Sequence, residues 1–179
     1  VLEIGANNTS TLFSGVIAGQ GGIGKVGSGD LELTGINTFG SERGGEYPVI
    51  LINEGSLTVG SDRSLGSPVG NGSVRIQDGA VLSFNDSTTV DVQRGIEFGS
   101  SGGKINVEGT SNVVIASELS GSGDFEKLGA GTLQLTSSNN SFSGTTTVSA
   151  GQLQVEGLYP SSATCTNQGS SNICSGVEP

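Results

Sequence analysis

The sequence predicts an all-β protein, a right-handed parallel β-helix (β-solenoid) of roughly eight or nine turns. Three observations support this prediction: short runs of alternating apolar and polar residues, turn residues between the runs, and an internal repeat. Glycine accounts for 32 of the 179 residues, and aromatic residues make up only 4%. This composition is typical of a repetitive β protein rather than of an average enzyme.

Nearly every apolar cluster is short and has a period of two, which is the pattern of a half-buried strand. Examples are "LELT", "SVRIQ", "TVDV", "TLQLT" and "QLQV". Turn sequences such as "GSG", "GNGS" and "SSGG" separate these clusters. No window carries the apolar stripe of an amphipathic helix. The runs of Val, Ile and Leu also argue against a disordered chain, which the glycine and serine content alone would allow.

A segment near the N-terminus recurs 102 residues later, where "GQGGIGKVGSGDLELTG" from residue 19 aligns with "GSGDFEKLGAGTLQLTS" from residue 121. The first copy fits most of a P-loop, but Val26 stands where a hydroxyl residue would bind magnesium. The second copy places Asp124 and Glu126 where a phosphate would lie. We therefore expect no nucleotide site. Repeated strand–turn units indicate a solenoid, and we expect Lys25 and Lys127 to cap a turn or cover the apolar edge of the coil.

An antiparallel β-sandwich is the alternative fold, because it also contains evenly spaced short strands. Its hairpins would need turns of the Asp-Gly or Asn-Gly type. The chain has one of each, at 78–79 and 71–72, which is too few for a domain built from hairpins. We expect a parallel β-helix made of two related repeat blocks over 1–157. Residues 158–179 are expected to form an irregular Cys-containing loop or a C-terminal cap.

The net charge of −10 and the isoelectric point of about 4.2 argue against binding to nucleic acid or to an anionic membrane. No apolar run approaches the roughly 18 residues that span a bilayer. The first residues, "VLEIGANNTS", lack the basic start and apolar core of a signal peptide. Because the chain begins in a strand-like run, we interpret it as a fragment of a longer protein.

The two cysteines, Cys165 and Cys174, enclose the polar loop "CTNQGSSNIC". Their spacing suits a local disulfide, which would indicate an oxidising compartment. The alternative is a pair of free thiols in a reducing compartment. Two cysteines alone are too few ligands for a structural metal site, and the chain has no histidine.

The absence of histidine excludes Ser–His and Cys–His catalysis within this chain. We expect no catalytic residue, no cofactor and no metal ligand. Four acids could bind calcium, although ordinary solvation is the expectation: Asp62, Asp78, Asp86 and Asp91. The phenylalanines are expected to stack in the core rather than to bind sugars: Phe13, Phe39, Phe84, Phe98, Phe125 and Phe142. Tyr47 and Tyr159 lie beside prolines, and we expect them to pack in loops.

The segment "FEKLGAGTLQLTSSNNSFSGTTTVSAGQLQV" resembles the autotransporter-associated β-strand repeat. The shared features are a lysine before a Gly-x-Gly turn, a T-L-x-L-T strand, an Asn-rich turn, an aromatic-Ser-Gly, and two further strands. The matching positions are Lys127, Gly129, Gly131, Leu133, Leu135, Asn140, Phe142, Gly144, Thr146, Val148, Gly151 and Leu153. The N-terminal copy matches through "KVGSGDLELTGINTFG" and then departs at an insertion.

This resemblance implies a secreted passenger region on the surface of a Gram-negative-type bacterium, exported by a C-terminal barrel that the segment lacks. The implied function is a non-catalytic adhesin, self-association or stalk module. Its partners would be surface glycans, matrix or other copies of itself, with no nucleic acid, and membrane only through the barrel. One alternative is a polysaccharide-cleaving β-helix enzyme whose acids meet between turns. Another is an ice- or mineral-binding face built on the threonines at 145–147.

Overall fold

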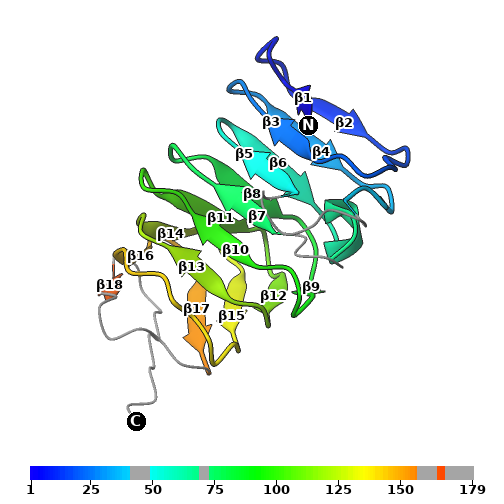
Figure 1. Ribbon diagram of the computed structural model, residues 1–179. Helices are drawn as coiled ribbons and strands as arrows, with labels where there is room; N and C mark the ends of the chain where they lie inside the picture. The colour runs from blue at the N-terminus through cyan, green and yellow to red at the C-terminus, as the bar shows by residue number, and fades with distance from the viewer. Residues whose placement is uncertain (41–48, 69–72, 157–164, 168–179) are drawn as a thin grey trace.

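The computed structural model describes residues 1–40, 49–68, 73–156 and 165–167. Strand pairing is parallel throughout this part of the chain, and strands of successive coils lie side by side along one axis (Figure 1). The predicted parallel β-solenoid is therefore confirmed, and the antiparallel sandwich is wrong. No described helix is long and apolar enough to cross a bilayer.

Three sheets run along the stack. Sheet A contains six strands: β1 (Leu2–Ile4), β3 (Ile23–Lys25), β5 (Ile50–Ile52), β7 (Val74–Ile76), β10 (Ile96–Phe98) and β13 (Leu119–Gly121). Sheet B contains eight: β2 (Thr11–Phe13), β4 (Asp30–Leu33), β6 (Ser56–Val59), β8 (Val81–Phe84), β11 (Gly103–Val107), β14 (Phe125–Leu128), β16 (Thr146–Val148) and β18 (Cys165–Asn167). Sheet C contains four: β9 (Thr88–Val90), β12 (Asn112–Ile115), β15 (Thr132–Leu135) and β17 (Gln152–Val155).

Counted in sheet A, the solenoid makes about six turns, slightly fewer than the eight or nine expected, although sheet B carries eight strands. The expectation assumed a coil of about 20 residues throughout. In sheet C, Leu133 does pair with Leu153, 20 residues further along the chain. In sheet A, however, Ile23 pairs with Ile50, a coil of 27 residues. Insertions in the N-terminal half therefore lengthen the coils and reduce their number.

The core consists of columns of inward side chains, one contributed by each coil. In sheet B one such column is formed by Leu31, Leu57, Leu82 and Ile105, which pair in register and are all buried. Full burial of such a side chain contributes about 1.5–3 kcal/mol, so the columns supply most of the stabilisation between coils. The alternating pattern of the sequence thus correctly predicts which side chains of each strand point into the core and which point outward.

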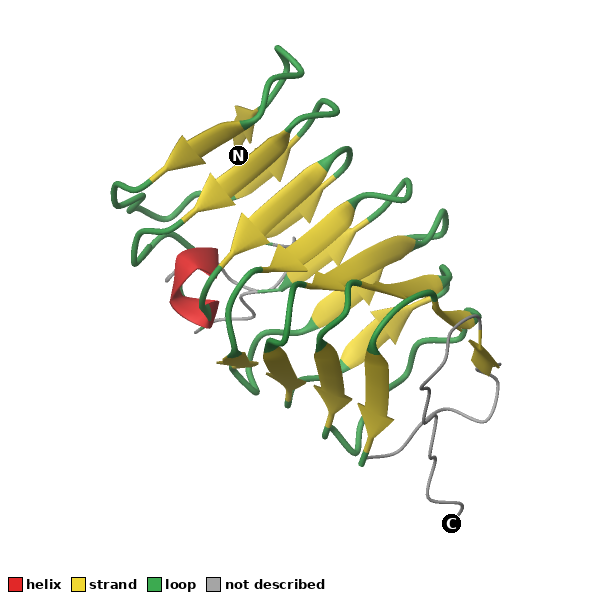
Figure 2. Ribbon diagram, turned by 180° about the vertical axis from the view of Figure 1, so that it is seen from behind, coloured by secondary structure: helices red, strands yellow, loops and turns green. Residues whose placement is uncertain are grey.

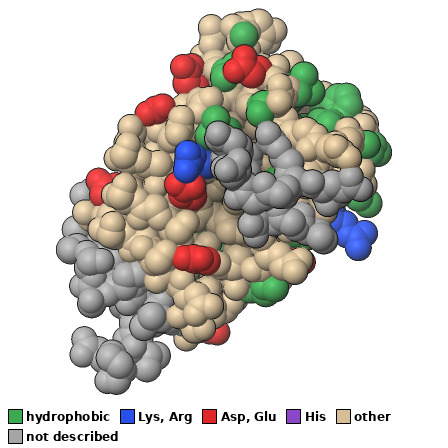
Figure 3. All heavy atoms as spheres, in the orientation of Figure 1, with side chains coloured by type: hydrophobic (Ala, Val, Ile, Leu, Met, Phe, Trp, Pro, Cys, Tyr) green, Lys and Arg blue, Asp and Glu red, His purple; other side chains and the backbone are tan. Residues whose placement is uncertain are grey.

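Five of the six phenylalanines are buried, as expected for core residues. Phe98 and Phe125 stack with their ring centroids 4.9 Å apart, and Phe142 lies edge-on to both rings. Phe13 differs, because 43% of its surface is exposed. It belongs to the first coil, on whose outer side no described coil packs. Figure 3 shows hydrophobic side chains gathered at this end, and Leu12 and Val16 are also exposed.

The two copies of the sequence repeat occupy different sheets. In the first copy, the strands around the Gly-rich turn are β3 in sheet A and β4 in sheet B. In the second copy, they are β14 in sheet B and β15 in sheet C. The same turn therefore forms two different corners of the solenoid, and the repeat describes a corner rather than a whole coil.

Each of these corners encloses a buried lysine. The Lys127 ammonium donates hydrogen bonds to the carbonyls of Leu128, Gly129, Gly131 and Ala150 at 2.7, 2.9, 3.0 and 3.2 Å. Its side chain is fully buried. Ala150 belongs to the next coil, so the lysine joins two coils as well as closing its own turn.

Lys25 makes the equivalent contacts in the first copy. Its ammonium donates to the carbonyls of Val26, Gly27 and Glu54 at 2.9, 2.7 and 3.1 Å. Both lysines therefore cap a turn, which is one of the two roles expected, and neither covers the edge of the coil. Burial lowers the pKa of Lys25, although the nearby carboxylates of Asp30 and Glu54 oppose this effect.

We expect the contribution of Lys127 to the free energy of unfolding to rise as the pH increases above about 8. Burial lowers the pKa of Lys127 from its ordinary 10.5 to about 8. Between these two values the unfolded chain binds more protons at this residue than the folded protein does, so the contribution of Lys127 to stability increases with pH. Below pH 8 that contribution is constant. The free energy of unfolding of the wild type relative to a Lys127→Met variant should therefore be larger at pH 10 than at pH 7, as measured by urea denaturation. An equal or smaller difference at pH 10 would contradict the lowered pKa.

Candidate functional site

The outward face of sheet B carries two columns of mainly polar side chains that cross successive coils. The register places the first column at Asp30, Ser56, Val81, Lys104, Glu126 and Thr147, and the second at Glu32, Thr58, Ser83, Asn106 and Leu128. Outward positions of a strand alternate with the inward core positions, so the same alternation that builds the core also builds this face.

Hydrogen bonds fix the side chains at the N-terminal end of this face. The hydroxyls of Ser56 and Thr58 both donate to Asp30 Oδ1, at 2.6 and 2.8 Å. Asn85, which directly follows β8, donates through Nδ2 to Glu32 Oε1 of β4 at 2.9 Å, and β6 lies between these two strands in the sheet. Each carboxylate is therefore held by donors from later coils, which orders the acids before any ligand arrives.

The middle of the face is connected in the same way. Asn106 Nδ2 donates to Ser83 Oγ at 2.8 Å, and Ser83 Oγ donates to Glu108 Oε1 at 3.1 Å. Ser83 is nearly buried even though its side chain lies on the outer face. The polar groups thus form a closely packed layer rather than a set of independent solvated chains.

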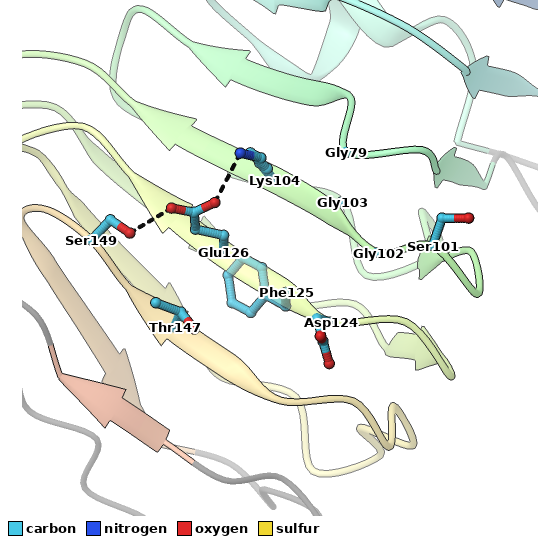
Figure 4. A pocket seen from close by; sticks show the side chains of 10 residues that line it. All are labelled: Gly79, Ser101, Gly102, Gly103, Lys104, Asp124, Phe125, Glu126, Thr147 and Ser149. Carbon is cyan, nitrogen blue, oxygen red and sulfur yellow. Dashed lines mark hydrogen bonds and ion pairs between the residues drawn. The ribbon is translucent and has the colours of Figure 1, made fainter.

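A shallow hollow of about 360 Å³ lies further along sheet B (Figure 4). Its lining includes Lys104, Asp124, Glu126, Thr147 and Ser149. Lys104 Nζ lies 3.0 Å from Glu126 Oε2, and Ser149 Oγ donates to Glu126 Oε1 at 2.5 Å. Asp124 lies at the other end of the hollow, where its Oδ1 accepts a hydrogen bond from the Thr145 amide at 2.8 Å.

The electrostatics of the hollow favour the charged form of Glu126. The hydrogen bonds from Ser149 and Lys104 lower the pKa of Glu126. A glycosidase needs one carboxyl group whose pKa is raised so that it stays protonated as a general acid. The Phe125 ring at this position points into the core and is buried, so it cannot stack on a sugar. The hollow therefore presents a fixed charge pair and hydroxyl groups.

The four acids considered for calcium are not brought together as one cluster. Asp62 pairs with Arg94 at 2.6 Å, Asp86 and Asp91 accept hydrogen bonds from nearby amides, and Asp78 lies in a turn at φ 55°. Asp62 and Asp91 do line one hollow. Within the described ranges, no group of three or more acidic or sulfur ligands is placed to hold a metal ion.

Arg94 is a buried residue that no sequence pattern singles out. Its guanidinium donates to the carbonyls of Leu65 and Gly66 at 3.0 and 2.7 Å and pairs with Asp62. Asp62 and Leu65 are the first and last residues of the short 3₁₀ helix η1 (Asp62–Leu65), and Gly66 directly follows it. A lone arginine in "DVQRG" carries no motif, so only the folded chain reveals this anchor.

The remaining residues of interest lie outside the described part of the chain. Cys174, Tyr47 and Tyr159 are not described, and for Cys165 the structure gives only its position at the start of β18. The Cys165–Cys174 disulfide therefore stays a prediction. β18 pairs in parallel with β16, so at these three residues the chain continues sheet B.

Comparison with known proteins places these features in a family. The passenger-associated transport repeat family matches residues 24–45 and 125–155, which include both lysine corners. A protein described as the adhesin BmaC autotransporter, from Brucella suis biovar 1 (strain 1330), is 30% identical over 157 residues. The match covers 82% of this chain and 4% of that relative, so the chain spans only a small part of its length. No solved structure matches this chain significantly. The parallel solenoid and these matches together support an autotransporter passenger segment that carries passenger-associated transport repeats.

Proposed function

We propose that this segment is a non-catalytic adhesive module displayed on the bacterial surface, with the outer face of sheet B as its contact surface. The observation that carries the proposal is the hydrogen-bonded network of side chains across successive coils of that face. A curated relative that bears the word adhesin in its description supports the same role. The partners we propose are surface glycans, matrix components or further copies of the segment.

The physical basis of the proposal is preorganisation. A ligand that meets flexible side chains loses affinity, because about 0.5–1.5 kcal/mol is needed to immobilise each one. On sheet B, Asp30, Glu32 and Glu126 are already held by neighbouring donors. A rigid polar surface of this kind suits many weak contacts to hydroxyl and amide groups. Repetition along the solenoid would then add avidity.

The alternative functions have less support. An enzyme acting on polysaccharide would need a general acid, and the pKa of Glu126 is lowered rather than raised. An ice-binding face would need a regular column of threonines. Thr147 instead shares its column with Glu126 and Lys104, and Thr146 is buried.

Two ion pairs of similar exposure provide a matched test of the contact surface. Lys104 and Glu126 lie on sheet B, with side chains 37% and 31% exposed. Arg75 and Glu97 lie on sheet A, with side chains 39% and 33% exposed. We expect the Lys104→Ala/Glu126→Ala variant to lose about tenfold or more in binding of segment-coated beads to host cells and matrix proteins. The Arg75→Ala/Glu97→Ala variant should bind like the wild type.

The outcomes separate adhesion from other roles of the same segment. Equal binding by both variants and the wild type would rule out sheet B as the contact surface. Wild-type beads that bind neither cells nor matrix would overturn the adhesive role itself and favour a stalk. Circular dichroism of each variant checks that the fold is retained, and sedimentation of the wild type measures its self-association.

A further inference from the structure

Another hollow lies beside η1, the red helix at one corner of the stack in Figure 2. Its volume is about 540 Å³, within the range of about 300–1,000 Å³ that is usual for small-molecule sites. The lining residues that matter here are Ile36, Asn37, Thr38, Arg63 and Pro68. None of these residues belongs to the outer face of sheet B.

Arg63 is unusual among the described cations. Lys25, Lys127 and Arg94 are buried, whereas Arg75 and Lys104 form ion pairs. Arg63 is exposed and makes no ion pair with any described residue. The described lining of its hollow contains no Asp or Glu, in a chain of net charge −10. This hollow therefore combines an exposed guanidinium with described lining residues that carry no acid, although Arg63 also lines the neighbouring hollow that contains Asp62 and Asp91.

The floor of the hollow is rigid because it is tied across coils. Asn37 is nearly buried, and its backbone amide donates to the Arg63 carbonyl at 3.0 Å. The side chain of Asn37 donates to the Ser64 carbonyl and accepts from the Ile17 amide, both at 2.7 Å. Three successive coils thus hold the backbone beneath Arg63 in one position, while the guanidinium stays exposed.

The chemistry around Arg63 points to a particular kind of ligand. A guanidinium presents two parallel N–H groups that match a carboxylate. Ile36 is 56% exposed and, with Pro68, offers an apolar surface beside that group. Thr38 adds a hydroxyl. A ligand with one carboxylate, several hydroxyls and an apolar ring face satisfies all three features.

We propose that this hollow binds a carboxylated saccharide, with the Arg63 guanidinium donating hydrogen bonds to the carboxylate and Ile36 contacting the sugar ring. This inference goes beyond the adhesive surface on sheet B, because it concerns different residues and commits to one class of glycan, the saccharides that carry a carboxylate. Its failure would leave the sheet B proposal intact, and loss of adhesion through Lys104 and Glu126 would leave this hollow untouched.

Titration of the purified segment with defined sugars, followed by amide chemical shifts in NMR spectra, tests the proposal. The probes are 3′-sialyllactose and digalacturonate, with lactose as the neutral match. We expect both carboxylated sugars to bind at least about tenfold more tightly than lactose, with shifts around Arg63. Arg63→Gln should abolish this preference, and Arg75→Gln should retain it. Higher salt should weaken binding of the charged sugars only.

Several results would overturn the proposal. One is that lactose binds as tightly as the two carboxylated sugars. Another is that the Arg63→Gln variant binds them like the wild type. A third is that the amide chemical-shift changes are confined to sheet B. A sulfated lactose that binds more tightly than either carboxylated sugar would also refute the carboxylate class. Arg63→Lys keeps the charge without the planar fork and should lose most of the preference. Ile36→Ser should weaken the binding of every sugar that occupies the hollow, so the test does not depend on one variant.

Discussion

Replacing Lys127 with methionine is expected to lower the free energy of unfolding by about 3–5 kcal/mol. Methionine would remove the ammonium that donates to four carbonyl oxygens, of which that of Gly131 also accepts from the Gln152 amide. Each unsatisfied buried polar group costs about 1–3 kcal/mol, partly offset because the ammonium no longer has to be desolvated. One acceptor, Ala150, belongs to the next coil, so the loss should also loosen the contact between coils.

Urea denaturation followed by circular dichroism measures this effect. Lys104→Met is the matched control, because Lys104 is half-exposed and forms a surface ion pair with Glu126. Pairs of this kind contribute about 0–1 kcal/mol, so this control should remain close to the wild type. Lys25→Met should behave like Lys127→Met, since it empties the equivalent corner. A loss below about 1 kcal/mol at Lys127 would show that the carbonyls find other donors or water.

Gly151→Ala is expected to be the second severe change, with a loss of more than about 3 kcal/mol. Gly151 has a φ of 66°, which a residue with a side chain adopts only with strain. A Cβ atom there would lie 2.3 Å from the Gly131 carbonyl oxygen and 2.5 Å from that of Gly129. Both oxygens are backbone atoms that also accept from the Lys127 ammonium, so neither can move without disturbing the corner.

Two other glycines separate the strain from the clash. Gly79 has a φ of 72° but no atom within 4 Å of an added Cβ, so Gly79→Ala should cost about 1 kcal/mol from strain alone. Gly95 has neither a positive φ nor a close neighbour, so Gly95→Ala should change stability by less than about 1 kcal/mol. The unfolding midpoint in urea should therefore be highest for Gly95→Ala, lower for Gly79→Ala and lowest for Gly151→Ala. Any other order would contradict the close approach of the coils at Gly151.

The parallel solenoid and its core could be predicted from short-range patterns. Alternation in "LELT" and "TLQL" places Leu31, Leu33, Leu133 and Leu135 inside, and all four are buried. The repeat also singled out Lys25 and Lys127, because both precede the same glycines. It did not reveal that the two lysines occupy different corners, since a local repeat contains no information about which sheet it joins.

The candidate sites could not be predicted in the same way. Lys104 meets Glu126 only because 22 residues separate their positions in consecutive coils. Arg63 shares a hollow with Ile36 and Thr38 because the Asn37 amide donates to the Arg63 carbonyl across adjacent coils. Such neighbours depend on the length of every insertion between them, and a change of one residue would move each outward side chain to the inner face.

The sequence by itself determined the parallel coil, its buried columns, and the lysine and glycine corners, because a period of two and a tight turn are local properties of the backbone. Tertiary structure decided the number of turns, the sheet that each repeat joins, the network on sheet B and the exposed Arg63. These features depend on the register between coils, and that register is fixed by the summed lengths of turns and insertions.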